Sequence, residues 1–271
     1  MKSQITHLKA LNSFYISAKY NDGTNIKISD QPTSHIHEEC EIYINLSGDV
    51  SFMVENRIYP VLPGNIIITR PYEYHHCIYH SDKLHKHYWI LFSSKGNEEL
   101  LDIYFKREAG ENNLLVLPAD STEELLSLCD RLCCGAENEI DNYSNFFKIL
   151  SLLKKADKPT LSSSLYPEDI AYTLNYINEN LSENLTIKEL AQKANVSVNT
   201  LERHFTEVLK TTPRNYIKKK RLANVLRLLS SGENVTEACI KSGISDYSGF
   251  IREFKGIYGI TPLKYQKQIL S

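Results

Sequence analysis

The sequence lacks the features that would place it in several common protein classes. None of its six cysteines forms a Cys-x-x-Cys pair, which argues against a zinc ribbon. The first residues show no basic start followed by an apolar stretch, so we expect no secretory signal peptide. No run approaches the roughly 18 apolar residues that a membrane span needs. We therefore expect a cytoplasmic protein whose cysteines are free and buried.

Charge is present in nearly equal amounts of both signs, but it is unevenly distributed. The 271 residues carry a formal net charge of -2, which does not mark the whole chain as a nucleic-acid binder. Residues 168–271 hold 15 Lys+Arg and 11 Asp+Glu, a net of +4, and the remainder holds 16 and 22, a net of -6. An acidic part joined to a basic part suits a sensor attached to a DNA-binding domain. Chance drift of surface charge is the alternative.

Short runs rich in β-branched and aromatic residues fill the first part of the chain. The runs are 41–45, 50–54, 66–69 and 87–92, and turn residues stand at 21–23, 47–49 and 63–65. Many short strands with regular turns predict an all-β barrel or sandwich.

From residue 121 the apolar residues recur at helical spacing instead. They are Leu125, Leu128, Cys129 and Leu132, followed by Phe146, Ile149, Leu150 and Leu153. This pattern predicts two helices separated by a polar loop. Such a helical hairpin could cover the barrel or pair with a second subunit, and the sequence leaves both roles open.

Prolines and serines then interrupt the periodic pattern, which indicates an interdomain linker. We predict a β-rich domain that ends in the helical hairpin over 1–158, a linker over 159–168 and an all-helical domain over 169–271. The expected fold class is α+β and multidomain, with an N-terminal β-barrel and helical hairpin followed by a C-terminal all-α double helix-turn-helix.

The helical part contains a helix-turn-helix pattern. Thr186 can cap a helix, with Glu189 as its capping-box partner, and the helix runs to Lys193. Residues 194–197 form a tight turn, and a second helix begins at Val198. In such a motif the second helix can lie in the DNA major groove.

The same pattern returns about 48 residues later, beginning at Thr236 and turning at 243–245. Both copies share a tail of identical spacing, made of Phe205, Pro213 and Tyr216 in the first and Phe254, Pro262 and Tyr265 in the second. A single helix-turn-helix pattern is weak evidence for such a motif, whereas two copies that each carry a tail of the same spacing are strong evidence. A helix over 214–229 would be about 24 Å long at 1.5 Å per residue. It would place the second helices of the two motifs, the reading helices, against adjacent faces of the major groove.

Residues 169–268 resemble the DNA-binding domain of the AraC/XylS family of bacterial regulators, chiefly through segments 243–255 and 258–265. Ile244 stands where that family usually has Phe. Gly249 stands where a larger side chain is usual, and we expect it to loosen the second reading helix.

The resemblance implies base contacts from the exposed positions of the two reading helices. These are Asn199, Glu202 and Arg203 in the first, and Tyr247, Ser248 and Arg252 in the second. Arg can bind guanine, Asn adenine and Glu cytosine. The two arginines could instead contact phosphate or a local carboxylate. The basic run 218–221 offers further phosphate contacts, and part of it is expected to be a solvated face.

A second set of residues stands in the predicted strands and resembles the two motifs of the cupin barrel. In metal-binding cupins two His, a Glu and a later His converge on one ion. The matching candidates for a divalent cation are His35, His37, Glu41 and His75. On a strand, His35 and His37 would face the same side.

A small-molecule pocket is the competing interpretation of the same residues. Sensor domains of AraC type often keep such positions without a known metal and bind a metabolite, commonly a sugar. The candidate effector-binding residues are His35, His37, Glu41, Tyr43, His75 and Trp89. Aromatic rings could stack on a sugar ring.

These features predict a DNA-binding transcription regulator controlled by a small-molecule effector, and not an enzyme. The resemblance implies a homodimer, formed through the helices between 121 and 155, and contact with RNA polymerase. The alternative is a metal-dependent cupin enzyme with a DNA-binding tail.

Overall fold

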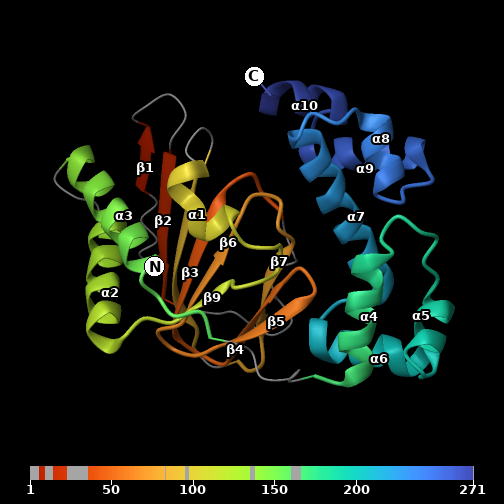
Figure 1. Cartoon of the computed structure of the whole chain (residues 1–271), viewed down its shortest axis with the longest axis horizontal. Coiled ribbons are helices and arrows are strands. Elements are labelled where there is room, and N and C mark those ends of the chain that lie inside the picture. The colour runs from red at the N-terminus through yellow and green to blue at the C-terminus, as the bar shows by residue number, and fades with distance from the viewer. Residues whose placement is uncertain are drawn as a thin grey trace. The chain divides into compact units, whose positions relative to one another are not determined.

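The computed structural model describes residues 6–9, 15–22, 36–82, 84–94, 98–134, 138–159 and 166–270. They fall into two compact units, an N-terminal unit, Met1–Ser162, and a C-terminal unit, Ser163–Ser271 (Figure 1). Most of the predicted linker lies outside the described residues. No helix in the described ranges is long and apolar enough to cross a membrane.

The N-terminal unit is built on two antiparallel sheets. Its strands are β1 (Thr6–Lys9), β2 (Tyr15–Asn21), β3 (Cys40–Ser47), β4 (Val50–Val54), β5 (Arg57–Val61), β6 (Ile66–Thr69), β7 (His75–Tyr79), β8 (Lys86–Phe92) and β9 (Leu114–Leu115). One sheet has the order β1-β2-β8-β3-β6-β9 and the other β5-β4-β7. The four predicted strands are confirmed as β3, β4, β6 and β8, whereas β1, β2, β5, β7 and β9 had not been predicted individually. Within the described strands no ladder joins the two sheets.

Alternate residues of β3 face opposite sides of the larger sheet. Ile42 and Ile44 belong to a buried cluster with Leu128 and Phe146, which come from the two long helices. Those helices, α2 (Ala119–Cys134) and α3 (Glu139–Leu153), cover this face of the sheet (Figure 1). The predicted hairpin and its apolar stripe are therefore confirmed. A short 3-10 turn, Glu98–Leu101, and α1 (Asp102–Phe105) precede them.

The opposite face of β3 looks toward the smaller sheet. Tyr43 and Ile67 of the larger sheet form one buried cluster with Phe52 and Tyr79 of the smaller sheet. The space between the sheets is therefore a second core, and residues of β3 at odd positions, such as Glu41 and Tyr43, point into it.

All six cysteines lie outside disulfides, and five of them are buried, as predicted. Cys134, at the end of α2, is exposed. The expectation of uniformly buried thiols was wrong at this position, because the residue falls on the solvent side of its helix.

The C-terminal unit is all-helical, as predicted. Its helices are α4 (Glu168–Glu179), α5 (Ile187–Lys193), α6 (Val198–Leu209), α7 (Pro213–Ser230), α8 (Val235–Lys241), α9 (Tyr247–Tyr258) and α10 (Pro262–Leu270). The pairs α5–α6 and α8–α9 are the two helix-turn-helix motifs. In each turn one backbone bond recurs, from Val196 N to Ala191 O and from Ile244 N to Cys239 O, both 3.0 Å.

Local side-chain caps decide where these helices begin. The Thr186 hydroxyl accepts from the Glu189 N–H at 3.1 Å, which confirms the predicted start of α5. The start of α8 was predicted at Thr236 and is corrected to Val235. Its cap is the Asn234 side chain, which accepts from the Glu237 N–H at 2.9 Å.

The repeated tail is explained by aromatic packing. The rings of Phe205 and Tyr216 meet edge to face with centroids 6.0 Å apart, and those of Phe254 and Tyr265 do so at 5.5 Å. In each copy a Pro begins the helix that carries the Tyr. The Phe–Tyr contact of each tail therefore packs the helix that follows against its reading helix.

Candidate DNA-reading surface and candidate ligand site

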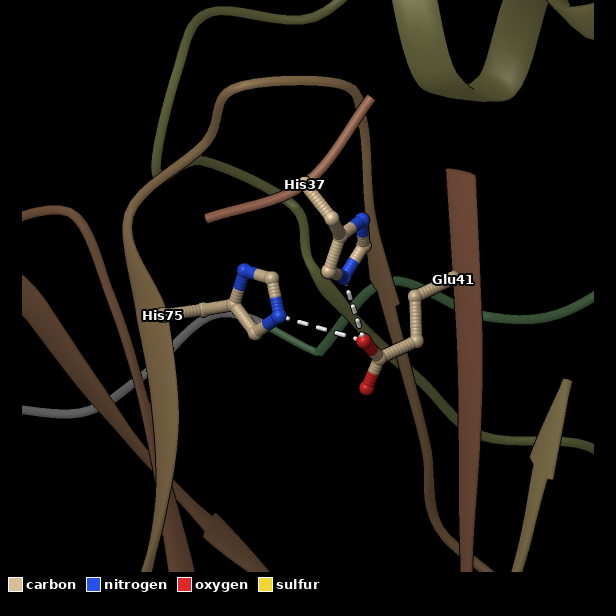
Figure 2. Close-up of side chains that lie close together, drawn as sticks. All are labelled: His37, Glu41 and His75. Carbon is tan, nitrogen blue, oxygen red and sulfur yellow. Dashed lines mark hydrogen bonds and ion pairs between the residues drawn. The ribbon is translucent and has the colours of Figure 1, made fainter. Parts of the chain in front are cut away.

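Three predicted ligand residues gather in the space between the two sheets. His37 Nε2 lies 2.9 Å and His75 Nε2 lies 3.1 Å from the same oxygen, Glu41 Oε2 (Figure 2). Glu41 and His75 are 2% and 1% exposed. The ligand atoms of all three lie within 4.8 Å of one another, a geometry that could hold a metal ion.

These three side chains come from separate parts of the fold. Glu41 lies on β3 and His75 begins β7, so the cluster bridges the two sheets. His37 precedes β3 in an irregular segment, which corrects the prediction that it lies on a strand. His35 lies outside the described residues, so its pairing with His37 stays a prediction.

Burial and mutual attraction compete in this cluster. Burial alone would raise the pKa of the Glu41 carboxyl, but the contacts and charges of His75 and His37 hold that pKa well below its usual range. Burial alone would lower the pKa of His75, and Glu41 outweighs it, so that pKa is raised. Without a cation, the cluster is held by protons shared between imidazole and carboxylate.

The two predicted aromatic effector contacts lie side by side. Tyr43 on β3 is the cross-strand partner of Trp89 on β8, so both side chains leave the sheet on the face that looks into the space between the sheets. Tyr43 is buried and Trp89 is half-buried. The Tyr43 ring also packs on His87, with centroids 4.8 Å apart.

Two polar residues of this face were missed by the sequence analysis. Thr69 is the cross-strand partner of Glu41, and His87 is that of Asn45. Among the described residues, Thr69 Oγ1 and His87 Nδ1 are buried without a hydrogen-bond partner. Burial outweighs the nearby charge of Glu41 and lowers the pKa of His87 to about 4, so this ring is neutral at pH 7. The face that each of them occupies follows from the strand register, so no local signal in the sequence marked them as residues of this space.

On the C-terminal unit, all six predicted base-contacting residues are exposed. Asn199, Glu202 and Arg203 lie on α6. Tyr247, Ser248 and Arg252 lie on α9. The structure therefore leaves these side chains accessible to a DNA groove, and their contacts with bases stay predictions.

Gly249 has a local role that the sequence analysis did not foresee. The Asp246 side chain caps α9 by accepting from the Gly249 N–H at 2.8 Å. A Cβ on residue 249 would lie 2.1 Å from Asp246 Oδ2. Helix α9 runs without a break through this position, so the glycine makes room for the cap of the second reading helix.

The basic run 218–221 is divided between the surface and the interior of the unit. Lys218 pairs with Glu253 at 2.9 Å, and Lys220 is buried. Burial, with a smaller effect of Arg227, lowers the pKa of Lys220 to about 7. Lys220 faces the core because of its place on α7, so it is not among the residues of the run that can reach a phosphate, and phosphate contacts of the others stay predictions.

Arg221 joins the two helix-turn-helix motifs. Its guanidinium donates to the carbonyls of Leu181 at 3.1 Å and Glu183 at 2.6 Å, in the segment that precedes α5. Gly243, in the turn of the second motif, approaches so closely that a Cβ there would lie 2.6 Å from Leu181 O. Arg221 thus holds the first motif against the turn of the second.

Replacing Arg221 by alanine should lower the free energy of unfolding of the C-terminal unit by about 1.5–3 kcal/mol, since hydrogen bonds to a charged group are lost. Urea unfolding followed by far-ultraviolet circular dichroism measures this. The matched control is Arg227→Ala, an exposed arginine of the same helix that bonds Asn224 and should cost about 0.5 kcal/mol or less. Equal losses in the two variants would contradict the bridging role.

Comparison with known proteins matches both units. Residues 30–147 match the family model of an AraC-like ligand binding domain, and residues 190–268 match that of a helix-turn-helix domain. The HTH-type transcriptional activator RhaS of Mannheimia succiniciproducens is 25% identical over 234 residues, which cover 84% of this chain and 87% of the relative. The uncharacterized HTH-type transcriptional regulator YisR of Bacillus subtilis is 24% identical over 249 residues, covering 83% and 82%.

Among solved structures, that of ToxT from Vibrio cholerae is similar to this chain, with 15% sequence identity and a TM-score of 0.37. The match covers 96% of this chain and 99% of the ToxT chain. That similarity is too low to add to the assignment, which is carried by the two family models and the curated relatives. With a ligand-binding domain followed by a helix-turn-helix domain, the chain belongs to the AraC family of DNA-binding transcriptional regulators.

Proposed function

We propose that a small molecule bound between the two sheets controls how the two reading helices engage DNA. The observation that carries this is the pair of buried polar atoms, Thr69 Oγ1 and His87 Nδ1, which have no partner among the described residues. Leaving such an atom unpaired costs about 1–3 kcal/mol. Hydroxyl groups of a ligand would satisfy atoms of this kind, and Thr69 lies beside Glu41 as its cross-strand partner.

A sugar or related metabolite suits this site best. A sugar ring presents hydroxyls at its edge and an apolar face of C–H groups. Tyr43 and Trp89 supply neighbouring aromatic surfaces on the same side of the sheet. The polar atoms of Thr69 and His87 belong to that side as well, so the site offers both stacking and hydrogen bonds.

The test uses the full chain and its single tryptophan, Trp89. A DNA site is first selected from a random duplex library, and its affinity is then measured with and without each member of a monosaccharide panel. We expect one sugar to quench Trp89 fluorescence and to change DNA affinity by about 5–150-fold, the usual range of coupling between sites. Tyr43→Ala should lose the response and keep the ligand-free affinity. A panel that changes neither signal would overturn the sugar proposal.

The proposal treats the N-terminal unit as a binding unit and not as an enzyme. A metal-dependent enzyme with a DNA-binding tail would consume its ligand. Mass spectrometry of the recovered sugar separates the two, because an effector returns unchanged after prolonged incubation and a substrate does not.

We further propose a homodimer that acts where the DNA lies, in the cytoplasm, and contacts RNA polymerase. Helix α3 supports the dimer, because Ile140 is 79% and Phe147 49% exposed. These residues stand seven positions apart, and therefore on one face of the helix. Light scattering of the purified chain tests this, and a monomeric mass at micromolar concentration would contradict it.

A further inference from the structure

A series of hydrogen bonds runs from helix α4 to a predicted base-reading side chain. His204, on the first reading helix α6, places its Nδ1 2.7 Å from Asp169 Oδ2, near the start of α4. The side chains of this pair are 21% and 9% exposed, so the bond is largely sheltered from water. On the other side of the same ring, Arg203 Nη2 lies 3.1 Å from His204 Nε2. His204 therefore links a point on α4 to Arg203.

The two partners decide which nitrogen of His204 carries the proton. An ionised carboxylate only accepts hydrogen bonds, and a guanidinium only donates them. Nδ1 therefore donates to Asp169, and Nε2 bears the lone pair that accepts from Arg203. The charge of Asp169 strengthens the first bond, and the bond made by one ring nitrogen decides the state of the other. Asp169 thereby keeps His204 an acceptor toward Arg203.

The contacts of Arg203 within the protein leave N–H groups for a base. Nη2 donates to His204, and Nη1 lies 3.3 and 3.4 Å from the two carboxylate oxygens of Glu207, one turn further along α6. Each terminal nitrogen of a guanidinium carries a second hydrogen, and a bidentate contact with guanine uses a pair of such hydrogens. The bond to His204 can therefore persist while Arg203 binds a base.

We propose that His204 is a positioning residue for base recognition, which holds the Arg203 guanidinium in the orientation that reads one base pair. An arginine side chain that is already ordered loses less conformational freedom when it binds. A guanidinium held in one orientation also discriminates better than one that can turn toward neighbouring bases. The inference rests on the predicted base contact of Arg203 and does not depend on the effector.

Two substitutions at residue 204 separate the two bonds of the ring. The amide of His204→Asn can take the place of Nδ1 and keep the bond to Asp169, but nothing replaces Nε2. The longer side chain of His204→Gln can instead bring an amide oxygen to the place of Nε2, where it accepts from Arg203. Both variants are compared with the native full chain by fluorescence anisotropy, on the selected DNA site and on all its single-base variants.

We expect His204→Asn to weaken binding to the selected site by about 2–12-fold, the cost of ordering one long side chain. The loss should fall on the base pair at which Arg203→Ala relaxes specificity. In the Arg203→Ala background the same substitution should change affinity by less than about twofold, because the effects of residues that act through one another do not add. His204→Gln should retain the native preference at that base pair.

A purely structural role of His204 would give a different result. A weakened contact between helices would lower affinity for every sequence alike, and it would do so in the Arg203→Ala background as well. The matched control is Tyr176→Phe, which removes the 3.2 Å bond from the Tyr176 hydroxyl on α4 to Glu189 Oε1 on α5. It breaks one bond between two helices of the same unit, leaves the Asp169–His204–Arg203 series intact, and should bind every site as the native chain does.

Urea unfolding followed by far-ultraviolet circular dichroism identifies a variant that does not fold. If His204→Asn fails in this way, Asp169→Asn replaces it. Its amide can donate to Nδ1 and move the ring proton to Nε2, so the same loss at one base pair is expected. An unchanged preference at that base pair, or a loss that adds to that of Arg203→Ala, overturns the inference and leaves the base contact standing. If Arg203→Ala relaxes specificity at no base pair, the inference is overturned together with the base contact.

Discussion

Replacing Arg107 by alanine should lower the free energy of unfolding of the N-terminal unit by about 3–5 kcal/mol, because a buried carboxylate then loses its charged partner. Arg107 bonds Glu73 through both terminal nitrogens, at 2.7 and 2.6 Å. The side chains of the pair are 4% and 0% exposed. The Gly110 N–H also donates to Glu73, at 2.8 Å, so the carboxylate would stay fixed in the interior after Arg107 is removed.

The same pair predicts the pH dependence of this unit. Burial alone would raise the pKa of Glu73, but the bonds and charge of Arg107 hold that pKa below its usual range. A carboxyl group with a depressed folded-state pKa stabilises the fold above its unfolded-state pKa. That contribution should be lost as the pH falls below about 4.5, toward the folded-state value, and Arg107→Ala should lack most of it.

Urea unfolding followed by Trp89 fluorescence measures both effects, since the single tryptophan lies in this unit. The matched control is Arg57→Ala. Arg57 and its partner Glu111 are 47% and 43% exposed, so breaking their pair should cost no more than about 1 kcal/mol. Similar losses for the buried and the exposed arginine would show that the Glu73–Arg107 pair does not hold the unit together.

The second large effect is expected at the reading helices. Arg203→Ala and Arg252→Ala should each weaken binding to a selected DNA site by about 1–3 kcal/mol, or roughly 5–150-fold, if each arginine contacts a base. Both side chains are exposed. Arg203 also pairs with Glu207 on its own helix at 3.3 Å, but an exposed pair of this kind is worth only about 0.3–0.5 kcal/mol and DNA can displace it.

Fluorescence anisotropy on the selected site and on its single-base variants distinguishes the kinds of contact. Loss of a base contact relaxes specificity at one position, whereas loss of a phosphate contact weakens all sequences equally. Arg131→Ala, an exposed arginine on α2 of the N-terminal unit, is the control and should bind as the native chain does. Unchanged affinity in both reading-helix variants would place the DNA contacts elsewhere.

Local signals made the C-terminal unit predictable. A cap lies within three residues of the group it bonds, so Thr186 marked the start of α5 from sequence alone. The start of α8 was misplaced because Asn234 and Thr236 are both good caps, and only the backbone geometry selects Asn234. The Phe and Tyr of each tail sit at a fixed spacing, so the repeat was visible before its ring packing was known.

The N-terminal unit was predictable as a class and less so in its site. Both faces of β3 are covered, and its first six residues are all buried, so the polar–apolar alternation that marks an inward face is absent. Thr69 and His87 therefore could not be recognised as interior polar residues. His37 was placed on a strand that the chain does not form there.

Local signals along the chain were enough to establish the order of the two units, the double helix-turn-helix and the residue types available for a ligand site. These depend on spacing along the chain, which caps, turns and periodicity record directly. Tertiary structure alone decided that Glu41 meets both His37 and His75, that Lys220 is buried and that Arg221 joins the two motifs. Each of these joins residues from separate elements or depends on how one helix packs against the others, so the environment of a side chain follows from the fold and not from its neighbours in the sequence.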